Sequence, residues 1–328
     1  MTVIDSNPKA HTAAGPATRS VFVDGGSGTT GLGIAERLAR QSDIVVKTIA
    51  DDKRKDPAAK RELMAEVDLV ILCLPDDAAK ETVALIDGMG QSAPKVLDAS
   101  TAYRVAPDWA YGFPEIAAGQ ADKIRNARKV SNPGCYPTGG IALLRPLVDA
   151  GLLPQDYPVT VNAVSGYSGG GKTMIAAFEN GTAPHFELYG LGLEHKHLPE
   201  LQLYSKLTRR PIFIPSVGNY RQGMLVSVPL QLDTLPGKPD GADLQAALAK
   251  HYAGSRYVSV MPLDGAAAKS GRLEPEALNE TNQLELYVFA SDTHHQAVLV
   301  ARLDNLGKGA SGAAVQNMRL MLGLPDLG

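Results

Sequence analysis

The feature that most constrains the fold is a glycine-rich segment that separates a short apolar stretch from a helical pattern. Residues 21–24 have the character of a strand, residues 25–33 are rich in glycine, and residues 34–40 have helical spacing. A strand, a glycine turn and a helix start, in this order, open a dinucleotide-binding unit, in which backbone amides approach a pyrophosphate. A glycine-rich connection that binds nothing is the alternative interpretation.

The residues predicted to hold the phosphates lie in this segment. Gly25, Gly28 and Gly31 repeat every three residues, and glycine allows a backbone to come close to a phosphate. The hydroxyl groups that could donate hydrogen bonds to phosphate oxygens belong to Ser27, Thr29 and Thr30.

A basic turn follows the second predicted strand, residues 44–49. Asp51 and Asp52 lie beyond the end of that strand, where an NAD-preferring site often carries an acid for the ribose. Three cations come next, Lys53, Arg54 and Lys55. These cations favour NADP, because they could pair with its extra phosphate; a solvated charged turn is the alternative.

Further α/β units follow. Helical patterns at residues 58–66 and 78–89 alternate with apolar strands at residues 69–74 and 95–98. This alternation predicts a parallel sheet with helices on both faces. Ser100 follows the last of these strands, and the carboxyl ends of parallel strands form ligand clefts, so we assign Ser100 to the cofactor site.

A cysteine in a tight turn is the candidate nucleophile. Cys135 follows Pro133 and Gly134 directly and precedes a helical pattern at residues 138–149. Free amides at a helix start favour the thiolate and thereby activate it. A small, inert core residue is the alternative interpretation for Cys135, and it is the interpretation we adopt for Cys73, which lies in an apolar run.

The second half of the chain is rich in predicted strands. This pattern predicts an α+β domain on a mostly antiparallel sheet. A polar loop, residues 165–172, ends at Lys172 and could bind anions or serve only as a connection. The predicted strands are residues 159–164, 225–232, 284–290 and 296–303.

Two histidines form a second chemical motif. His195 and His197 lie two residues apart, so we expect them to share one face of a strand. Either could move protons near neutral pH, and one of the two could be merely structural. No cysteine or acid cluster with ligand spacing lies nearby, so we predict no metal site.

Composition excludes several classes of protein. The chain has 328 residues, a net charge of -3 and a pI near 6.2, which suggests two domains and no nucleic-acid partner. No apolar run is long enough to span a membrane. Residues 1–18 resemble a flexible leader without a secretion signal, and two cysteines predict a reducing, cytoplasmic location.

At this point the chain resembles the N-acetyl-γ-glutamyl-phosphate reductase family, in the shorter of its two forms. The resemblance runs from about residue 21 to the end, and Lys196 stands where many relatives carry arginine. Its motifs occupy residues 25–33, 111–115, 131–140, 165–172, 195–200, 305–312 and 315–318.

The resemblance implies a fold like that of aspartate-semialdehyde and glyceraldehyde-phosphate dehydrogenases. Residues 19–134 and 307–328 would form an NADP-binding Rossmann domain with a parallel sheet. Residues 135–306 would form the catalytic and oligomerisation domain, and the helix at residues 315–323 would return to the first domain. A homodimer or homotetramer is expected.

The resemblance also implies the reaction, which belongs to arginine biosynthesis. Cys135 would form a thioester with N-acetyl-γ-glutamyl phosphate, and NADPH would reduce it to the semialdehyde after phosphate has left. His197, or else His195, would serve as acid and base, with a preference for His197. Ser311 and Gly312 join the cofactor site. The substrate-binding residues would be Arg104, Glu115, Asn132, Lys172 and Arg221.

Two other functions remain open from the sequence. An aspartate-semialdehyde dehydrogenase, or a related phosphorylating aldehyde dehydrogenase, would keep the cysteine, the histidine and NADP and change only the acyl pocket. A non-catalytic NADP sensor would bind the cofactor and leave Cys135 unreactive.

Overall fold

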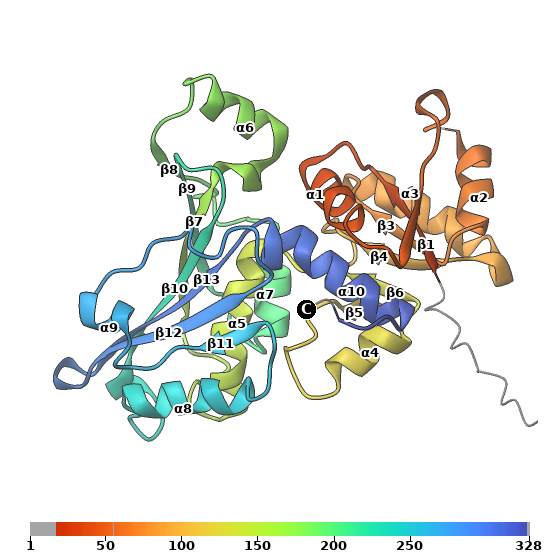
Figure 1. The fold of residues 1–328 in the computed structure, drawn as a ribbon. Coiled ribbons are helices and arrows are strands. Elements are labelled where there is room, and N and C mark those ends of the chain that lie inside the picture. The colour runs from red at the N-terminus through yellow and green to blue at the C-terminus, as the bar shows by residue number, and fades with distance from the viewer. Residues whose placement is uncertain (1–17, 55, 327–328) are drawn as a thin grey trace, which may run out of the picture.

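The computed structural model describes residues 18–54 and 56–326. All but the last residue of the predicted leader, and Lys55, lie outside the described residues. Two sheets form the centres of two separate bodies, which a returning C-terminal helix joins (Figure 1).

The first sheet is parallel throughout, as the sequence predicts. Its strands lie in the order β2-β1-β3-β4-β6-β5. The side chains of β3 are buried along its whole length, which is typical of a strand covered on both faces. The strands are β1 (Arg19–Asp24), β2 (Ile44–Lys47), β3 (Leu69–Leu72), β4 (Lys95–Asp98), β5 (Ala110–Tyr111) and β6 (Lys129–Ser131). The helices between them are α1 (Thr29–Leu38), α2 (Pro57–Ala65), α3 (Asp76–Asp87) and α4 (Gln120–Asn126).

The second sheet is mostly antiparallel, also as predicted. Its order is β11-β12-β13-β10-β7-β9-β8, and only the pairs β7–β9 and β11–β12 are parallel. The strands are β7 (Thr160–Gly166), β8 (Phe186–Leu188), β9 (Ile212–Gly218), β10 (Met224–Gln231), β11 (Val258–Val260), β12 (Leu284–Ser291) and β13 (Gln296–Leu303). The remaining helices are α5 (Cys135–Asp149), α6 (Gly171–Glu179), α7 (Leu198–Tyr204), α8 (Gly241–His251), α9 (Ala266–Ser270) and α10 (Gly312–Leu322).

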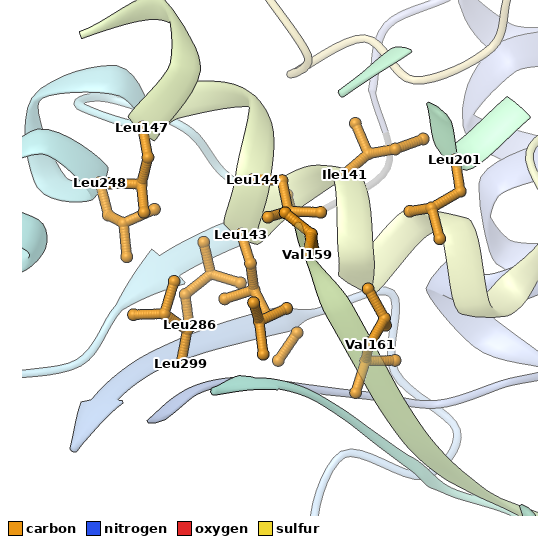
Figure 2. Close-up of a cluster of buried hydrophobic side chains, with 14 of the residues drawn as sticks. Ile141, Leu143, Leu144, Leu147, Val159, Val161, Leu201, Leu248, Leu286 and Leu299 are labelled. Atoms are coloured by element: carbon orange, nitrogen blue, oxygen red, sulfur yellow. The ribbon is translucent and has the colours of Figure 1, made fainter. Parts of the chain in front are cut away.

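Helix α5 is packed into the core of the second body. Figure 2 shows its side chains, among them Leu143 and Leu147, between the sheet and neighbouring helices. Both leucines are fully buried, and replacing such a leucine by alanine costs about 2–5 kcal/mol of stability. This packing holds the first residue of α5, Cys135, in a fixed place.

Helix α10 returns to the first body, as the family resemblance implies. Its residues Val315, Met318 and Met321 share a buried cluster with Ile34 of α1 and Ile124 of α4. In Figure 1 this helix lies between the two bodies. The division of the chain into domains at residues 134 and 307 stays a prediction.

The two histidines do not lie on a strand, so that prediction is wrong. His195 and His197 occupy a turn, and His197 is the residue that precedes α7. Pro199 lies in the first turn of this helix, where its missing N–H costs nothing. The two-residue spacing of these histidines therefore belongs to a turn and the helix start after it, and not to a strand.

Candidate active site

A pocket of about 540 Å3 lies where elements of both bodies meet. It extends from the glycine turn before α1 to the start of α5 and the π-helical turn Gly307–Ser311. Most of the residues predicted from the sequence to act in catalysis or binding line this one pocket. They are Gly28, Thr29, Thr30, Gly31, Arg104, Asn132, Cys135, Lys172, His195 and His197.

Cys135 is the first residue of α5. Gly134 precedes the helix in an extended conformation and offers no side-chain cap, and Pro137 carries no N–H. The amides at this helix start therefore point toward the sulfur. The amide of Tyr136 and the charge of Arg104 lower the pKa of Cys135, but burial outweighs them and raises that pKa to about 11. Burial thus opposes the ready ionisation that the sequence predicts for this thiol.

Three polar side chains converge on Gly134. A Cβ atom at this position would lie 2.6 Å from Nη1 of Arg104, 2.7 Å from Oε1 of Glu200 and 2.9 Å from Nε2 of His197. The φ angle of Gly134 is an ordinary -74°, so crowding and not backbone conformation requires glycine. The Pro-Gly-Cys sequence thereby brings an arginine, an acid and a histidine close to the thiol.

Glu200 is a site residue to which the sequence analysis gave no role. Its carboxylate is 1% exposed, accepts from Nη1 of Arg104 at 2.7 Å and from the Tyr111 hydroxyl at 2.9 Å, and also accepts from the Gly134 N–H at 3.1 Å. The sequence signal that could have found it is an acid one residue after Pro199 and three after His197, a spacing typical of the first turn of a helix.

Arg104 is held between Glu200 and the pocket. Its Nη2 donates to the carbonyl of Ala99 at 3.2 Å, while its buried Nε has no hydrogen-bond partner among the described residues. The hydroxyl of Tyr204 donates to the Arg104 carbonyl at 2.8 Å. The guanidinium is thus fixed beside the thiol with a donor left for an anion.

Burial disfavours the charged form of both histidines. Burial, then the charge of Arg104, lowers the pKa of His197 well below its ordinary value. Burial also lowers the pKa of His195 to about 4, and its Nδ1 accepts from the His197 N–H at 3.2 Å. Nδ1 of His197 is buried without a partner within the described part of the chain. A neutral imidazole can accept a proton, and His197 lines the same pocket as Cys135, which makes it a candidate base.

The other end of the pocket is the start of α1. Gly28 precedes this helix in an extended conformation, again without a side-chain cap, and Thr29, Thr30 and Gly31 line the pocket. Gly25 has φ of +85°, and a Cβ at Gly31 would lie 2.6 Å from its carbonyl oxygen. The uncapped amides and the tight glycine turn fit a dinucleotide phosphate. Ser27 is exposed and is not among the residues that line the pocket.

The predicted cofactor residues outside this turn lie away from the pocket lining. The Ser100 hydroxyl donates to the carboxylate of Asp98, two residues earlier, at 2.6 Å. Ser311 donates to the Leu306 carbonyl and accepts from Arg37, and Gly312 lines a different pocket. Arg54 is exposed in the turn after β2. These four assignments stay predictions.

Two predicted substrate-binding residues are engaged elsewhere. Glu115 binds Lys308, with both carboxylate oxygens 2.9 Å from its Nζ, and does not line the pocket. Arg221 is exposed and pairs with Glu179 at 2.9 Å. Neither side chain lines the pocket that holds Cys135, and their assignment to the substrate site stays a prediction.

Asn132 and Lys172 do line the pocket. The Asn132 amide donates to the Ala310 carbonyl at 3.1 Å and accepts from Asn317 at 3.1 Å, so it also fixes the π-helical turn. Lys172 is exposed at the start of α6. Cys73, which the sequence analysis assigns to the core, also lines the pocket. Burial raises the pKa of its thiol to about 12.

Within residues 18–54 and 56–326, no group of three or more histidine, cysteine, aspartate and glutamate side chains is arranged to hold a metal ion. Nor does this part of the chain contain a helix with the length and apolarity needed to cross a membrane.

Comparison with protein families places two models along the chain. The model "Semialdehyde dehydrogenase, NAD binding domain" matches residues 20–126, and "Semialdehyde dehydrogenase, dimerisation domain" matches residues 135–305. The chain is 54% identical over 308 residues to the N-acetyl-gamma-glutamyl-phosphate reductase of Brucella ovis, covering 92% of this chain and 98% of that protein. It is 55% identical over 309 residues to the enzyme of the same name from Chelativorans sp., covering 93% and 98%.

Solved structures share the fold at low sequence identity. An aspartate semialdehyde dehydrogenase from Francisella tularensis superposes with a TM-score of 0.70 at 12% identity, over 93% of this chain and 100% of that chain. The corresponding enzyme from Candida albicans, solved with NADP, gives a TM-score of 0.63 at 14% identity, over 93% and 99%.

Proposed function

The chain belongs to the N-acetyl-gamma-glutamyl-phosphate reductase family, and we propose that its pocket reduces N-acetyl-γ-glutamyl phosphate to N-acetylglutamate 5-semialdehyde and phosphate. The observation that carries this proposal is a single pocket lined by Cys135, by His197 and by the glycine turn before α1. A nucleophile, a proton acceptor and a phosphate cradle are what a phosphorylating aldehyde dehydrogenase needs.

The first step acylates Cys135. The sulfur attacks the γ-carbonyl carbon while the thiol proton passes to neutral His197, the C–O bond to phosphate breaks, and the proton leaves with the phosphate. Because the pKa of the free thiol is about 11, this base-assisted transfer is the route open near neutral pH. The product is a thioester on Cys135.

The second step reduces that thioester. Bound NADPH would supply a hydride to the acyl carbon. His197 delivers a solvent-derived proton to the carbonyl oxygen, which gives a thiohemiacetal on the sulfur. The same ring then takes the hydroxyl proton as the C–S bond breaks, and returns it to the sulfur as the semialdehyde leaves.

The residues around Cys135 stabilise the charges of these steps. The amides of Cys135 and Tyr136 at the start of α5 would bind the oxyanion that develops on the carbonyl oxygen. Arg104, fixed by Glu200, lines the same pocket, has a buried Nε without a partner among the described residues, and would bind the phosphate or the carboxylate. Lys172 would add a second, more mobile cation.

We propose NADP as the cofactor, with the start of α1 holding its pyrophosphate and Arg54 its extra phosphate. Replacing Lys53, Arg54 and Lys55 together by alanine should weaken NADPH binding about tenfold and NADH binding far less, because only NADPH carries the extra charge. Fluorescence titration with both nucleotides measures this, and equal losses would remove the role of these cations.

A second copy of this chain is the proposed partner, bound to the open face of the second sheet. Leu225 and Val300 face away from α5 and line a groove of about 740 Å3, while their neighbours Val226 and Ala301 pack toward the helix. Phe186 and Leu188 at its rim are 56% and 50% exposed. The family model that matches this body is a dimerisation domain, which supports a homodimer as the basic unit.

Sedimentation equilibrium tests this surface. The protein should sediment as a dimer or tetramer at micromolar concentration, and Val300→Lys should shift it toward the monomer because a buried lysine is costly. A wild-type monomer, or an unaffected Val300→Lys variant, would refute the assignment.

We place the enzyme in the cytoplasm, since both cysteines are free thiols.

Assays of two substrates decide between the candidate activities. With NADP and phosphate, oxidation of N-acetylglutamate semialdehyde followed at 340 nm (a property of reduced nicotinamide) should exceed that of aspartate semialdehyde by at least about a hundredfold. The reverse order would favour an aspartate-semialdehyde dehydrogenase. No turnover with either, together with NADPH binding and slow alkylation of Cys135, would favour a sensor.

A further inference from the structure

A lysine is fully buried next to the active site without lining the pocket. Lys308 is 1% exposed. Its Nζ lies 2.9 Å from each carboxylate oxygen of Glu115 and 2.8 Å from Oε1 of Gln316. Gln316 in turn donates to Glu115 at 2.8 Å. We refer to Lys308, Glu115 and Gln316 as the buried ammonium network.

The network is matched to one ammonium group. A lysine has three N–H donors, and the three acceptor atoms account for them. The rings of Phe113 and Tyr257 lie 5.6 Å and 5.1 Å from Nζ and add cation–π attraction. Burial lowers the pKa of Lys308, and the charge of Glu115 opposes this shift. A buried charge is retained at this cost only where its pairing is complete.

Lys308 belongs to the turn that forms a wall of the pocket. The turn Gly307–Ser311 is π-helical: the Gly309 N–H donates to the Asp304 carbonyl at 3.0 Å and the Ser311 N–H donates to the Leu306 carbonyl at 2.9 Å. Such wide turns are rare and concentrate at functional sites. While the Lys308 side chain enters the network, Gly309 and Ala310 line the pocket.

The wall lies directly against the nucleophile. A Cβ atom at Gly309 would be 2.8 Å from Cβ of Cys135. Asn132, three residues before Cys135, donates to the Ala310 carbonyl at 3.1 Å. A shift of this turn would therefore change the space around the sulfur, and small displacements in an active site cost up to about a hundredfold in rate.

We propose that the buried ammonium network is a positioning device that holds the π-helical turn against Cys135 and so sets the orientation and reactivity of the thiol. Glu115 comes from the loop after β5, whereas Lys308 lies in the turn and Gln316 in α10, which follows the turn directly, so the network ties the loop to the turn and its helix. None of its three residues lines the pocket. The link to turnover rests on the proposed function, whereas the effect on thiol reactivity does not.

Three variants of the full-length protein test the proposal. Lys308→Met leaves Glu115 buried without its partner, and Lys308→Met/Glu115→Gln removes both charges at similar volume. Glu115→Asp keeps the pair but shortens its reach. The readouts are Tm, kcat and KM of the reductase reaction, and the rate at which iodoacetamide alkylates the Cys135 peptide in mass spectrometry. Lys206→Met, which removes an exposed pair with Asp149, is the matched control.

The double variant separates positioning from mere stability. We expect its Tm to recover toward the wild type, while kcat stays about tenfold low at an almost unchanged KM and the alkylation rate differs at least about threefold. A double variant with wild-type kcat and alkylation overturns the proposal. If it does not fold, Glu115→Asp decides: a kcat reduced about fivefold at constant KM supports the proposal, and wild-type values overturn it. A changed alkylation rate without any reductase turnover would refute the proposed reaction and leave the positioning role supported.

Discussion

Helices α1 and α5 begin in the same local geometry, yet the proposed function gives them different roles. Each follows a glycine in an extended conformation, with φ and ψ of -76° and 165° at Gly28 and of -74° and 152° at Gly134. Neither has a side-chain cap, and both starts line the same pocket. Their free amides offer partial positive charge in both cases.

Burial and neighbours make the difference between the two. Gly28, Thr29 and Thr30 are half-buried, so the amides of α1 are open to an anion from outside. Gly134 is buried, its N–H is taken by Glu200, and the amides that remain face a sulfur of the protein itself. In the proposed mechanism the same backbone geometry would bind an external phosphate at the start of α1 and support a covalent nucleophile at the start of α5, and burial would decide which.

The largest effect is expected from a substitution that removes the sulfur at the start of α5. Cys135→Ser should lower kcat by at least about a thousandfold, because a serine hydroxyl is a far weaker nucleophile, while NADPH affinity stays within about twofold. Cys73→Ser, the matched control at the other cysteine, should retain at least about a third of the activity. Turnover near the wild-type rate in Cys135→Ser would end the thioester mechanism.

The next largest effect is expected from a substitution that crowds the buried residues at the start of α5. Gly134→Ala places a Cβ within 2.9 Å of Arg104, Glu200 and His197, so these groups must move. We expect kcat/KM to fall about a hundredfold and stability to fall by about 1–3 kcal/mol, measured by steady-state kinetics and urea unfolding. Gly192→Ala, where the new Cβ meets no atom of the described residues within 4 Å, is the control. Near-normal kinetics in Gly134→Ala would contradict the convergence of these three groups.

A smaller effect is expected at the start of α1. Gly31→Ala brings a Cβ within 2.6 Å of the Gly25 carbonyl and should weaken NADPH binding about tenfold by reshaping the turn. The alkylation rate of Cys135 should not change. At Gly26 the nearest atom would be 3.7 Å away, so Gly26→Ala should weaken binding less. If Gly31→Ala changed alkylation and not NADPH affinity, the two helix starts would not have separate roles.

The smallest effect concerns pH. Because burial lowers the pKa of His197 well below 6.5, the ring remains a neutral proton acceptor as the pH falls from about 7.5 to about 6. We expect kcat/KM to change less than about twofold over this range, where a histidine with an ordinary pKa would lose about fourfold. Tm should decrease as the pH falls below 6.5, since unfolded histidines bind protons that the buried ones do not. A pH profile with an acidic limb at 6.5 or above would contradict the assignment of His197.

Local patterns in the sequence predicted much of this molecule. The buried run at β3, the glycine turn before α1 and the Pro-Gly-Cys turn before α5 each determine their own backbone, because the side chains involved are neighbours along the chain. The sequence pattern therefore predicted the parallel sheet, the mostly antiparallel sheet and the candidate nucleophile. It did not predict the turn of His195 and His197, since spacing of two residues suits a strand and a helix start alike.

The sequence by itself thus determined the type of each sheet and which residue types can do chemistry, although the helices predicted from residues 34 and 138 begin at Thr29 and Cys135. Only the tertiary structure decided their roles. It pairs Glu115 with Lys308, 193 positions away. It also places Glu200 against Arg104 and Gly134, and it buries Cys135, which raises the pKa of the thiol. The reason is physical: hydrogen bonds within a turn depend on adjacent residues, whereas desolvation and charge pairing depend on every segment that packs around a group.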